Sequence, residues 1–387
     1  MLSCFTCYYI IKGSWFKKFY FRKSDDMILD FLIQKLTETN PPELNADKCI
    51  NSFGKNNGCS KCKESCPENA IVLKDNKVFI EENLCNQCGI CRAICPTQAI
   101  RIKGTGEDEI FTVAWEKKNL VFACSMEDTI SNLNISCLNA LHPEFISSLF
   151  ILHKEKKFHF NLSKCSNCRY GYENTIFNDN LNKAIRFVNT LGIDPVYEIH
   201  TEESGLSDLV IEEISRRNLF KLVKKESGNM VAKTVISIID VEDHKPTIRN
   251  ILQNSIKSLK LNYENDGPNV FWEYWDVNID CDGCSKCISV CPGKAWKLEK
   301  DDTSIKLYYK SDNCYKCGLC EKICPKRAIA KGSIDDIKIS EFNLKRDIKL
   351  SICKSCNNKF ISVSNEANEC DICKKKELLR RKISSFN

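Results

Sequence analysis

The residues best suited to chemistry in this chain of 387 residues are its 26 cysteines. Four of them open the same short pattern, C-P-x-x-A-I/W, which marks one unit repeated along the chain. The four copies are CPENAI from Cys66, CPTQAI from Cys95, CPGKAW from Cys291 and CPKRAI from Cys324. No stretch of about eighteen residues is apolar enough to span a membrane, and no secretion signal is visible, so we expect a cytoplasmic protein. In that reducing compartment, closely spaced cysteines act as metal ligands rather than disulfides.

The spacing within the units indicates iron-sulfur clusters. Three of the four units follow C-x2-C-x2-C-x3-C-P without deviation, starting at Cys85, Cys281 and Cys314. Thiolates two residues apart in one loop can reach three corners of a single cube, and the turn that follows carries the fourth cysteine toward a neighbouring cube. Proline ends that turn because it has no amide hydrogen. The alanine allows close approach of the backbone, and the Ile or Trp after it can shield a cluster from water.

These units resemble the bacterial-type two-cluster 4Fe-4S ferredoxin domain family in two copies, as in a polyferredoxin. The copies are module 1, residues 47–103, and module 2, residues 276–332. The resemblance implies that each module is a pseudo-twofold pair of short hairpins and short helices, in which the fourth cysteine of each unit ligates the other unit's cluster. The implied ligands are Cys49, Cys59, Cys62 and Cys95 for cluster 1, Cys66, Cys85, Cys88 and Cys91 for cluster 2, Cys281, Cys284, Cys287 and Cys324 for cluster 3, and Cys291, Cys314, Cys317 and Cys320 for cluster 4. Zinc is the alternative, although zinc sites seldom use four-cysteine runs that end in C-P.

The first unit of module 1 departs from this spacing. Nine residues separate Cys49 from Cys59, where the other units have two, and the added stretch is rich in glycine and asparagine, as in a surface loop. We expect Cys49 to remain a ligand, because its lead-in NADKC matches EENLC, NIDC and SDNC of the other units. The alternative is that Cys49 is idle and that cluster 1 has three irons or an open corner.

Four more cysteines between the modules, Cys124, Cys137, Cys165 and Cys168, form what we term the middle site. They fall in a predicted small α/β unit, residues 110–172, in which NLVFAC, NISCL and KFHFNL are strands and HPEFISSLFILHK is a helix. Loops converge at strand ends in such a unit, so we predict a fifth iron-sulfur site there. The spacing resembles that of four-cysteine iron-sulfur domains in subunits that couple hydrogenases or formate dehydrogenases to heterodisulfide reductase-like enzymes. A zinc site and buried structural thiols are the alternatives.

The segment 345–376 carries two C-x2-C knuckles, Cys353 with Cys356 and Cys370 with Cys373, which we term the ribbon site. The pattern is that of a zinc ribbon, whose closed Cys4 site is structural and needs its metal to fold. Iron in a rubredoxin-like site fits the same tetrahedral set of sulfurs. Lysines and arginines gather in the basic tail, residues 377–387, and just before it, which indicates a solvated helix face or else a docking surface.

The remaining segments complete an α+β multidomain chain. Residues 1–26, with Cys4 and Cys7 left without a role, are an extension that could be spurious because Met27 is an alternative start, and residues 27–46 are a helical lead-in. Residues 173–275 contain no cysteine and predict a mostly helical spacer that includes the amphipathic segment NDNLNKAIRFVNTLG. The five histidines do not stand at ligand spacing from any cysteine, so we expect them to be surface or structural residues.

A cluster takes up one electron without bonding to a substrate, so a row of clusters predicts electron transfer. We expect an electron-relay subunit of an anaerobic redox complex, with redox partner proteins, four 4Fe-4S clusters, the fifth site and a zinc ion. No flavin or NAD motif is visible, since G-x-G-x-x-G is absent, and catalysis by this chain alone is not expected. Two alternatives stay open: an iron-sulfur oxidoreductase subunit with chemistry at the middle site, and a redox-sensing regulator that binds nucleic acid or protein through the ribbon. The net charge of +6 gives no strong field toward nucleic acid.

Overall fold

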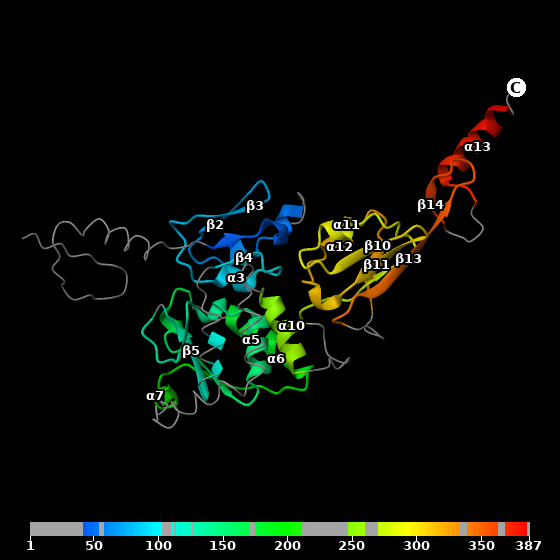
Figure 1. Cartoon of the computed structure of the whole chain (residues 1–387). Coiled ribbons are helices and arrows are strands. Elements are labelled where there is room, and N and C mark those ends of the chain that lie inside the picture. The colour runs from blue at the N-terminus through cyan, green and yellow to red at the C-terminus, as the bar shows by residue number, and fades with distance from the viewer. Residues whose placement is uncertain are drawn as a thin grey trace, which may run out of the picture. The chain divides into compact units, whose positions relative to one another are not determined.

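A computed structural model describes residues 42–53, 58–102, 110–111, 114–115, 117–125, 127–170, 175–210, 247–259, 270–332, 339–362 and 368–384 (Figure 1). The elements below all belong to one compact unit, Pro41–Asn387. The extension with Cys4 and Cys7, nearly all of the helical lead-in and residues 211–246 of the spacer lie outside the described residues. Within the described part of the chain, no helix is long and apolar enough to cross a membrane.

Module 1 consists of two antiparallel strand pairs and two short helices. The outer pair is β1 with β4, and the inner pair is the hairpin of β2 and β3. In chain order the elements are β1 (Glu43–Leu44), η1 (Ala46–Lys48), η2 (Ile50–Phe53), α2 (Lys61–Glu64), β2 (Ile71–Lys74), β3 (Lys77–Ile80), α3 (Ile90–Ile94) and β4 (Ile100–Arg101). The core between them is made of cysteines and small or branched apolar residues, among them Ile71, Val78 and Ile100. The short helices that the resemblance implied are present, but one of the two expected hairpins is instead a pair of strands from opposite ends of the module.

Module 2 has the same two strand pairs and two short helices, but its 3-10 helix precedes the second helix instead of the first. Its outer pair is β9 with β12, and its hairpin is β10 with β11. The elements are β9 (Trp275–Val277), α11 (Lys286–Ser289), β10 (Trp296–Lys300), β11 (Ser304–Tyr309), η6 (Ser311–Asn313), α12 (Leu319–Ile323) and β12 (Ile329–Lys331). An asparagine starts the lead-in of each module in the same way, because Asn45 N–H donates to Ala99 O and Asn278 N–H donates to Ala328 O, both at 2.8 Å.

The hairpin of module 2 differs in that it continues into the C-terminal segment. The long strand β13 (Asn343–Ile352) pairs with β11 and also with β14 (Lys359–Ile361), which gives the antiparallel order β10-β11-β13-β14. The ribbon site follows on the same strand, and its last cysteine lies on α13 (Asp371–Ser384), which includes most of the predicted basic tail. The ribbon is thus attached to module 2 through a shared β-sheet.

The α/β unit is built on a parallel four-stranded sheet in the order β6-β5-β7-β8. The strands are β5 (Asn119–Cys124), β6 (Leu133–Ile135), β7 (Lys157–Asn161) and β8 (Val196–His200). The helices are η3 (Leu138–Ala140), α5 (Pro143–Leu152), η4 (Cys165–Asn167), α6 (Thr175–Asn189), α7 (Leu206–Val210) and α10 (Ile248–Ser258). Phe122, Phe158 and Phe160 stack along one face of the sheet, and Phe150 meets Phe158 edge to face. The strands and the helix predicted between residues 119 and 161 are confirmed.

The α/β unit extends beyond residue 172, so the following segment is not a separate spacer. Helices α6 and α10 pack against α5, and β8 is the fourth strand of the sheet. The physical reason is that every residue of α5 is buried, so this helix needs apolar cover on all sides. The amphipathic helix predicted around residue 184 supplies part of that cover with Leu181, Ala184 and Val188. The sequence did not predict β8. It is an edge strand whose residues are mostly exposed, so it lacks the buried apolar face that marks a half-buried strand.

Candidate metal centres

Four cysteines from both units of module 1 line one cavity: Cys49, Cys59, Cys62 and Cys95. The insertion after Cys49 is closed by Asn51, whose side-chain amide donates to Cys59 O at 2.6 Å while its oxygen accepts from Cys59 N–H at 2.9 Å. Gly58, just before Cys59, has a φ of +50°, the left-handed conformation that Gln87 adopts before Cys88 in the second unit. Asn51 and Gly58 together therefore return the chain to the geometry of an uninterrupted unit, with Cys49 in place.

The other predicted sets are also brought together. Cys66, Cys85, Cys88 and Cys91 line a second cavity, and Cys281, Cys284, Cys287 and Cys324 line a third. Cys291 lies close enough to Cys314, Cys317 and Cys320 to affect the ionisation of the last two. In each module the fourth cysteine of one unit therefore joins the first three of the other, which is the exchange that the resemblance implied.

The turn after each Cys-Pro pair sets the direction of the backbone amide of the repeat's alanine. The residue before that alanine has a left-handed backbone in all four units: φ is +51° at Asn69, +52° at Gln98, +52° at Lys294 and +50° at Arg327. This turn points the alanine amide back at the cysteine. Ala99 N–H donates to Cys95 Sγ at 3.2 Å, Ala295 N–H to Cys291 Sγ at 3.2 Å and Ala328 N–H to Cys324 Sγ at 3.3 Å. Amide donors of this kind stabilise a sulfur that carries negative charge and tune the potential of a cluster bound to it.

Burial makes these cavities unsuitable for free thiolates. Burial raises the pKa of Cys62 to about 11 and that of Cys287 to about 12, and the charges of neighbouring cysteines add to each rise. Burial likewise raises the pKa of Cys317 to about 11. A cationic group is needed to hold such thiols in the ionised form. The four-sulfur cavities therefore fit iron-sulfur clusters in the chemistry of their donors as well as in number.

The cysteines of the middle site all follow strands of the parallel sheet. Cys124 is the last residue of β5, and Cys137 comes after β6, directly before η3. Cys165 is the first residue of η4, which follows β7, and Cys168 comes directly after η4. Burial raises the pKa of Cys137 to about 12, and the charges of Cys124 and Cys165 add to the rise. The carboxyl ends of parallel strands meet at one edge of a sheet, which is why residues so far apart in sequence converge here.

The middle site adjoins the cavity predicted to hold cluster 2, a contact that the sequence did not reveal. Ser136 joins the two, because its hydroxyl donates to Cys88 O at 3.0 Å and its carbonyl accepts from the Cys124 thiol at 3.2 Å. Cys88 and Cys137 also pack together with Ile90 in one small buried group. A cluster in the middle site would therefore lie against a predicted ligand of cluster 2.

Gly89→Ala is expected to weaken this contact more than Gly318→Ala, which changes the matching position of module 2. Both glycines have a left-handed φ, +83° and +69°, so both variants carry similar backbone strain. A Cβ at Gly89 would lie 2.8 Å from the Cβ of Ala140, whereas at Gly318 it would meet no described atom within 4 Å. Overpacking of this kind costs about 1–3 kcal/mol. Denaturant midpoints measured without oxygen should therefore fall further for Gly89→Ala, and equal falls would contradict the contact.

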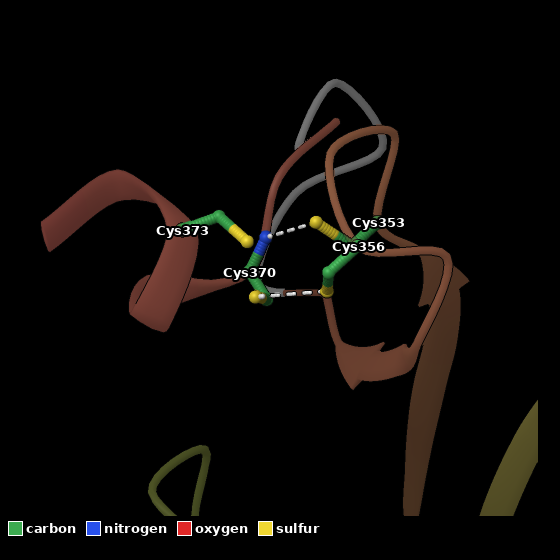
Figure 2. Close-up of side chains that lie close together, drawn as sticks. All are labelled: Cys353, Cys356, Cys370 and Cys373. Atoms are coloured by element: carbon green, nitrogen blue, oxygen red, sulfur yellow. Dashed lines mark hydrogen bonds between the residues drawn. The ribbon is translucent and has the colours of Figure 1, made fainter. Parts of the chain in front are cut away.

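The ribbon site is more compact than the cavities of the two modules. The sulfurs of Cys353, Cys356, Cys370 and Cys373 all lie within 4.8 Å of one another, and those of Cys356 and Cys370 are 3.9 Å apart (Figure 2). Cys370 N–H donates to Cys353 Sγ at 3.3 Å and, with other backbone amides, lowers the pKa of Cys353 to about 6. Zn–S bonds of about 2.3 Å in a tetrahedron place the sulfurs about 3.8 Å apart. The ribbon site therefore fits one ion rather than a cluster.

A buried arginine on α10 connects the two modules. The side chains of Arg249 and Glu144 are only 3% and 5% exposed. They form a bidentate ion pair, in which Arg249 Nε and Nη2 donate to the two carboxylate oxygens of Glu144, each at 2.7 Å. The same guanidinium donates to Asp312 O and Cys314 O in module 2. Gln98 in module 1 donates to Glu144 at 2.9 Å and accepts from Arg249 N–H at 3.1 Å.

The charges of this pair stabilise each other. Burial alone would raise the pKa of Glu144, but the charge of Arg249 and its hydrogen bonds outweigh burial and hold that pKa below its usual range. The Arg249 guanidinium also lies 4.7 Å from the centre of the Tyr315 ring, and Lys48 of module 1 lies 5.9 Å from the same ring. Tyr315 follows Cys314, and Lys48 precedes Cys49. Residues next to proposed ligands of clusters 1 and 4 thus meet at one aromatic ring.

Comparison with known proteins agrees with the cysteine spacing of the two modules. Two family models, each described as a 4Fe-4S dicluster domain, match residues 57–100 and 280–328. The first match begins after Cys49, as expected from the insertion. An uncharacterized ferredoxin of Methanocaldococcus jannaschii is 34% identical over 58 residues, which are 14% of this chain and 89% of that protein. The chain therefore belongs to the family of two-cluster 4Fe-4S ferredoxins and contains two domains of that family.

Proposed function

We propose that this chain is an electron relay in which clusters 1 to 4 and an iron-sulfur cluster in the middle site form one series. The observation that carries the proposal is that each neighbouring pair of sites is joined by contacts of a few residues. Iron-sulfur clusters exchange single electrons, so sites in such contact conduct along the chain. The ligand sets are those implied by the family pattern, and the cavities support them.

The order of the series follows from the contacts. The middle site lies against cluster 2 through Ser136 and Cys88. Within module 1, α2 and α3 each connect a ligand of cluster 1 with a ligand of cluster 2, and α11 and α12 do the same for clusters 3 and 4. Clusters 1 and 4 approach each other where Gln98, Glu144 and Arg249 link the modules. The series therefore runs from the middle site through clusters 2, 1 and 4 to cluster 3.

Cluster 3, at the end of the series opposite the middle site, is the cluster that a partner protein can approach. Cys284 of cluster 3 is exposed, whereas the other proposed ligands of the four ferredoxin clusters are buried or half-buried. The nearby Ile279 is 68% exposed, an apolar side chain of the kind that partner surfaces cover. We place the exchange of electrons with a redox partner protein at cluster 3, and we assign the chain to a larger anaerobic redox complex as a subunit without catalysis of its own. Zinc in the ribbon site has a structural role in this proposal.

The metal content of protein purified without oxygen tests the proposal. We expect about twenty irons per chain, four for each of five cubes, and one zinc. Cys168→Ser should lower the count to about sixteen irons, because it removes a ligand of the middle site. Cys7→Ser is the matched control and should leave the content unchanged. Fewer than about twelve irons in the unaltered protein would refute two complete modules, and a Cys168→Ser variant with full iron would refute the fifth cluster.

A further inference from the structure

Three polar side chains share one face of the α/β sheet at its open edge. β7 and β8 are parallel, and their register sets His159 opposite Glu198. His200 follows Glu198 by two residues and therefore points to the same face of β8. Two imidazoles and a carboxylate are thus placed together by strand pairing alone. None of them belongs to the cysteine sites or to the proposed relay.

The distances between their ligand atoms are those of a metal site. His159 Nδ1 lies 2.9 Å from His200 Nε2 and 3.4 Å from Glu198 Oε2, and His200 Nε2 lies 3.6 Å from Glu198 Oε2. Three atoms with these separations can all lie about 2.1 Å from a single point, which is the length of zinc–nitrogen and zinc–oxygen bonds. No side chain has to move to form that triangle.

Hydrogen bonding explains only part of this arrangement. A proton between the imidazoles accounts for the 2.9 Å contact, but the two separations from Glu198 Oε2 exceed the usual 2.7–3.2 Å of a hydrogen bond. The other carboxylate oxygen of Glu198 is held by Lys157 Nζ at 2.6 Å. This contact orients the carboxylate so that Oε2 faces the imidazoles, which is what an outer-shell partner does for a metal ligand.

We propose that His159, Glu198 and His200 bind a divalent transition-metal ion of the zinc and iron(II) class. Two imidazoles and one carboxylate suit these ions, and three protein ligands leave further positions for water or another small ligand. His159 is 1% exposed, whereas His200 and Glu198 are 20% and 48% exposed, so the site is anchored in the sheet and open toward solvent. The nitrogen and oxygen donors distinguish it from all the sulfur sites of the chain.

Zinc titration of the full chain, purified without oxygen, tests this site. After incubation with Zn²⁺ and removal of unbound metal, we expect two zinc ions per chain, one in the ribbon site and one here. His200→Ala should retain one zinc and its full iron content, the latter showing that the fold is intact. Glu198→Gln preserves the shape of the side chain and should weaken zinc binding at least about tenfold. Glu202→Gln, an exposed carboxylate further along the chain, is the matched control and should retain both ions.

The Cys356→Ser variant separates this site from the ribbon, since we expect it to keep one zinc. X-ray absorption at the zinc edge should then show only nitrogen and oxygen neighbours at about 2.0–2.1 Å and no sulfur at about 2.3 Å. Sulfur neighbours in that variant would overturn the proposal, as would a second zinc that persists in both His200→Ala and Glu198→Gln. A single zinc that the unaltered protein retains and the Cys356→Ser variant loses would also overturn it. The iron content, which is measured in parallel, tests the proposed relay separately. Loss of the zinc proposal would therefore not count against the relay.

Discussion

Replacing Arg249 with glutamine is expected to destabilise the protein by about 3–5 kcal/mol, the cost of leaving one member of a buried ion pair without its counter-charge. Glu144 would stay buried with only Gln98 as a side-chain donor. The Cys314 carbonyl would lose its bond from the guanidinium, whereas the Asp312 carbonyl would keep the bond from Gln253. The measurement is the midpoint of anaerobic unfolding in guanidinium, followed through the visible absorbance of the clusters. Because Arg249 also holds the backbone of Cys314, we expect cluster 4 to be lost first.

Two controls make the Arg249 result specific. Arg381 pairs with Glu377 on the exposed face of α13, and Arg381→Gln should change stability by less than about 0.5 kcal/mol. The double replacement of Glu144 and Arg249 by methionine should be less damaging than the single change at Arg249, because it leaves no unpaired buried charge. If Arg249→Gln is as stable as Arg381→Gln, the buried pair does not hold the modules together.

Removing the ion from the ribbon site is expected to unfold that segment while the clusters remain. A structural zinc site contributes about 10–16 kcal/mol in small zinc-dependent peptides, far more than the three-residue strand β14 can supply. After treatment with a zinc chelator, protease should cut rapidly at Lys359 and at the lysines that begin α13. β13 should resist, because its first half is paired with β11. Limited proteolysis with mass spectrometry, together with iron analysis, measures both parts.

The Cys356→Ser variant should show the same cleavage without chelator, and Ser355→Ala, its exposed neighbour, should not. An unchanged cleavage pattern after loss of zinc would mean that the ribbon folds without its ion. Iron recovered from the site in place of zinc would assign it to the rubredoxin-like alternative, which uses the same four sulfurs.

The cysteine sets of the two modules could be predicted because their ligands are local. Three of the four runs of cysteines span eleven residues, so spacing along the chain nearly determines spacing in the fold. The role of Cys49 was also predictable from its lead-in. The hydrogen bonds that close the inserted loop between Cys49 and Cys59 were not. That closure depends on Asn51, which no pattern distinguishes from other asparagines in a polar loop.

Long-range contacts could not be predicted. The partners of Arg249 come from four separate segments of the chain, so the residue looks like any arginine on an amphipathic helix. Likewise, His159 and His200 lie on strands whose pairing sequence periodicity does not reveal, and β8 has too little buried surface to be recognised. The expectation that the histidines are only surface or structural residues rests on spacing from cysteines, a criterion that cannot detect ligands from neighbouring strands.

The short helices of the modules set a limit on how this chain can be regulated. In each module two pairs of cysteines four residues apart, such as Cys62 within α2 and Cys66 shortly after it, are the proposed ligands of neighbouring clusters. Four residues of helix advance about 6 Å, and the short covalent chain between the two cysteines limits how far they can separate. Thermal motion or a bound partner therefore changes little within a pair of clusters. The contacts at Ser136 and Arg249 are non-covalent. In the proposed relay we therefore expect a bound partner to change the rate of electron transfer mainly at these two places.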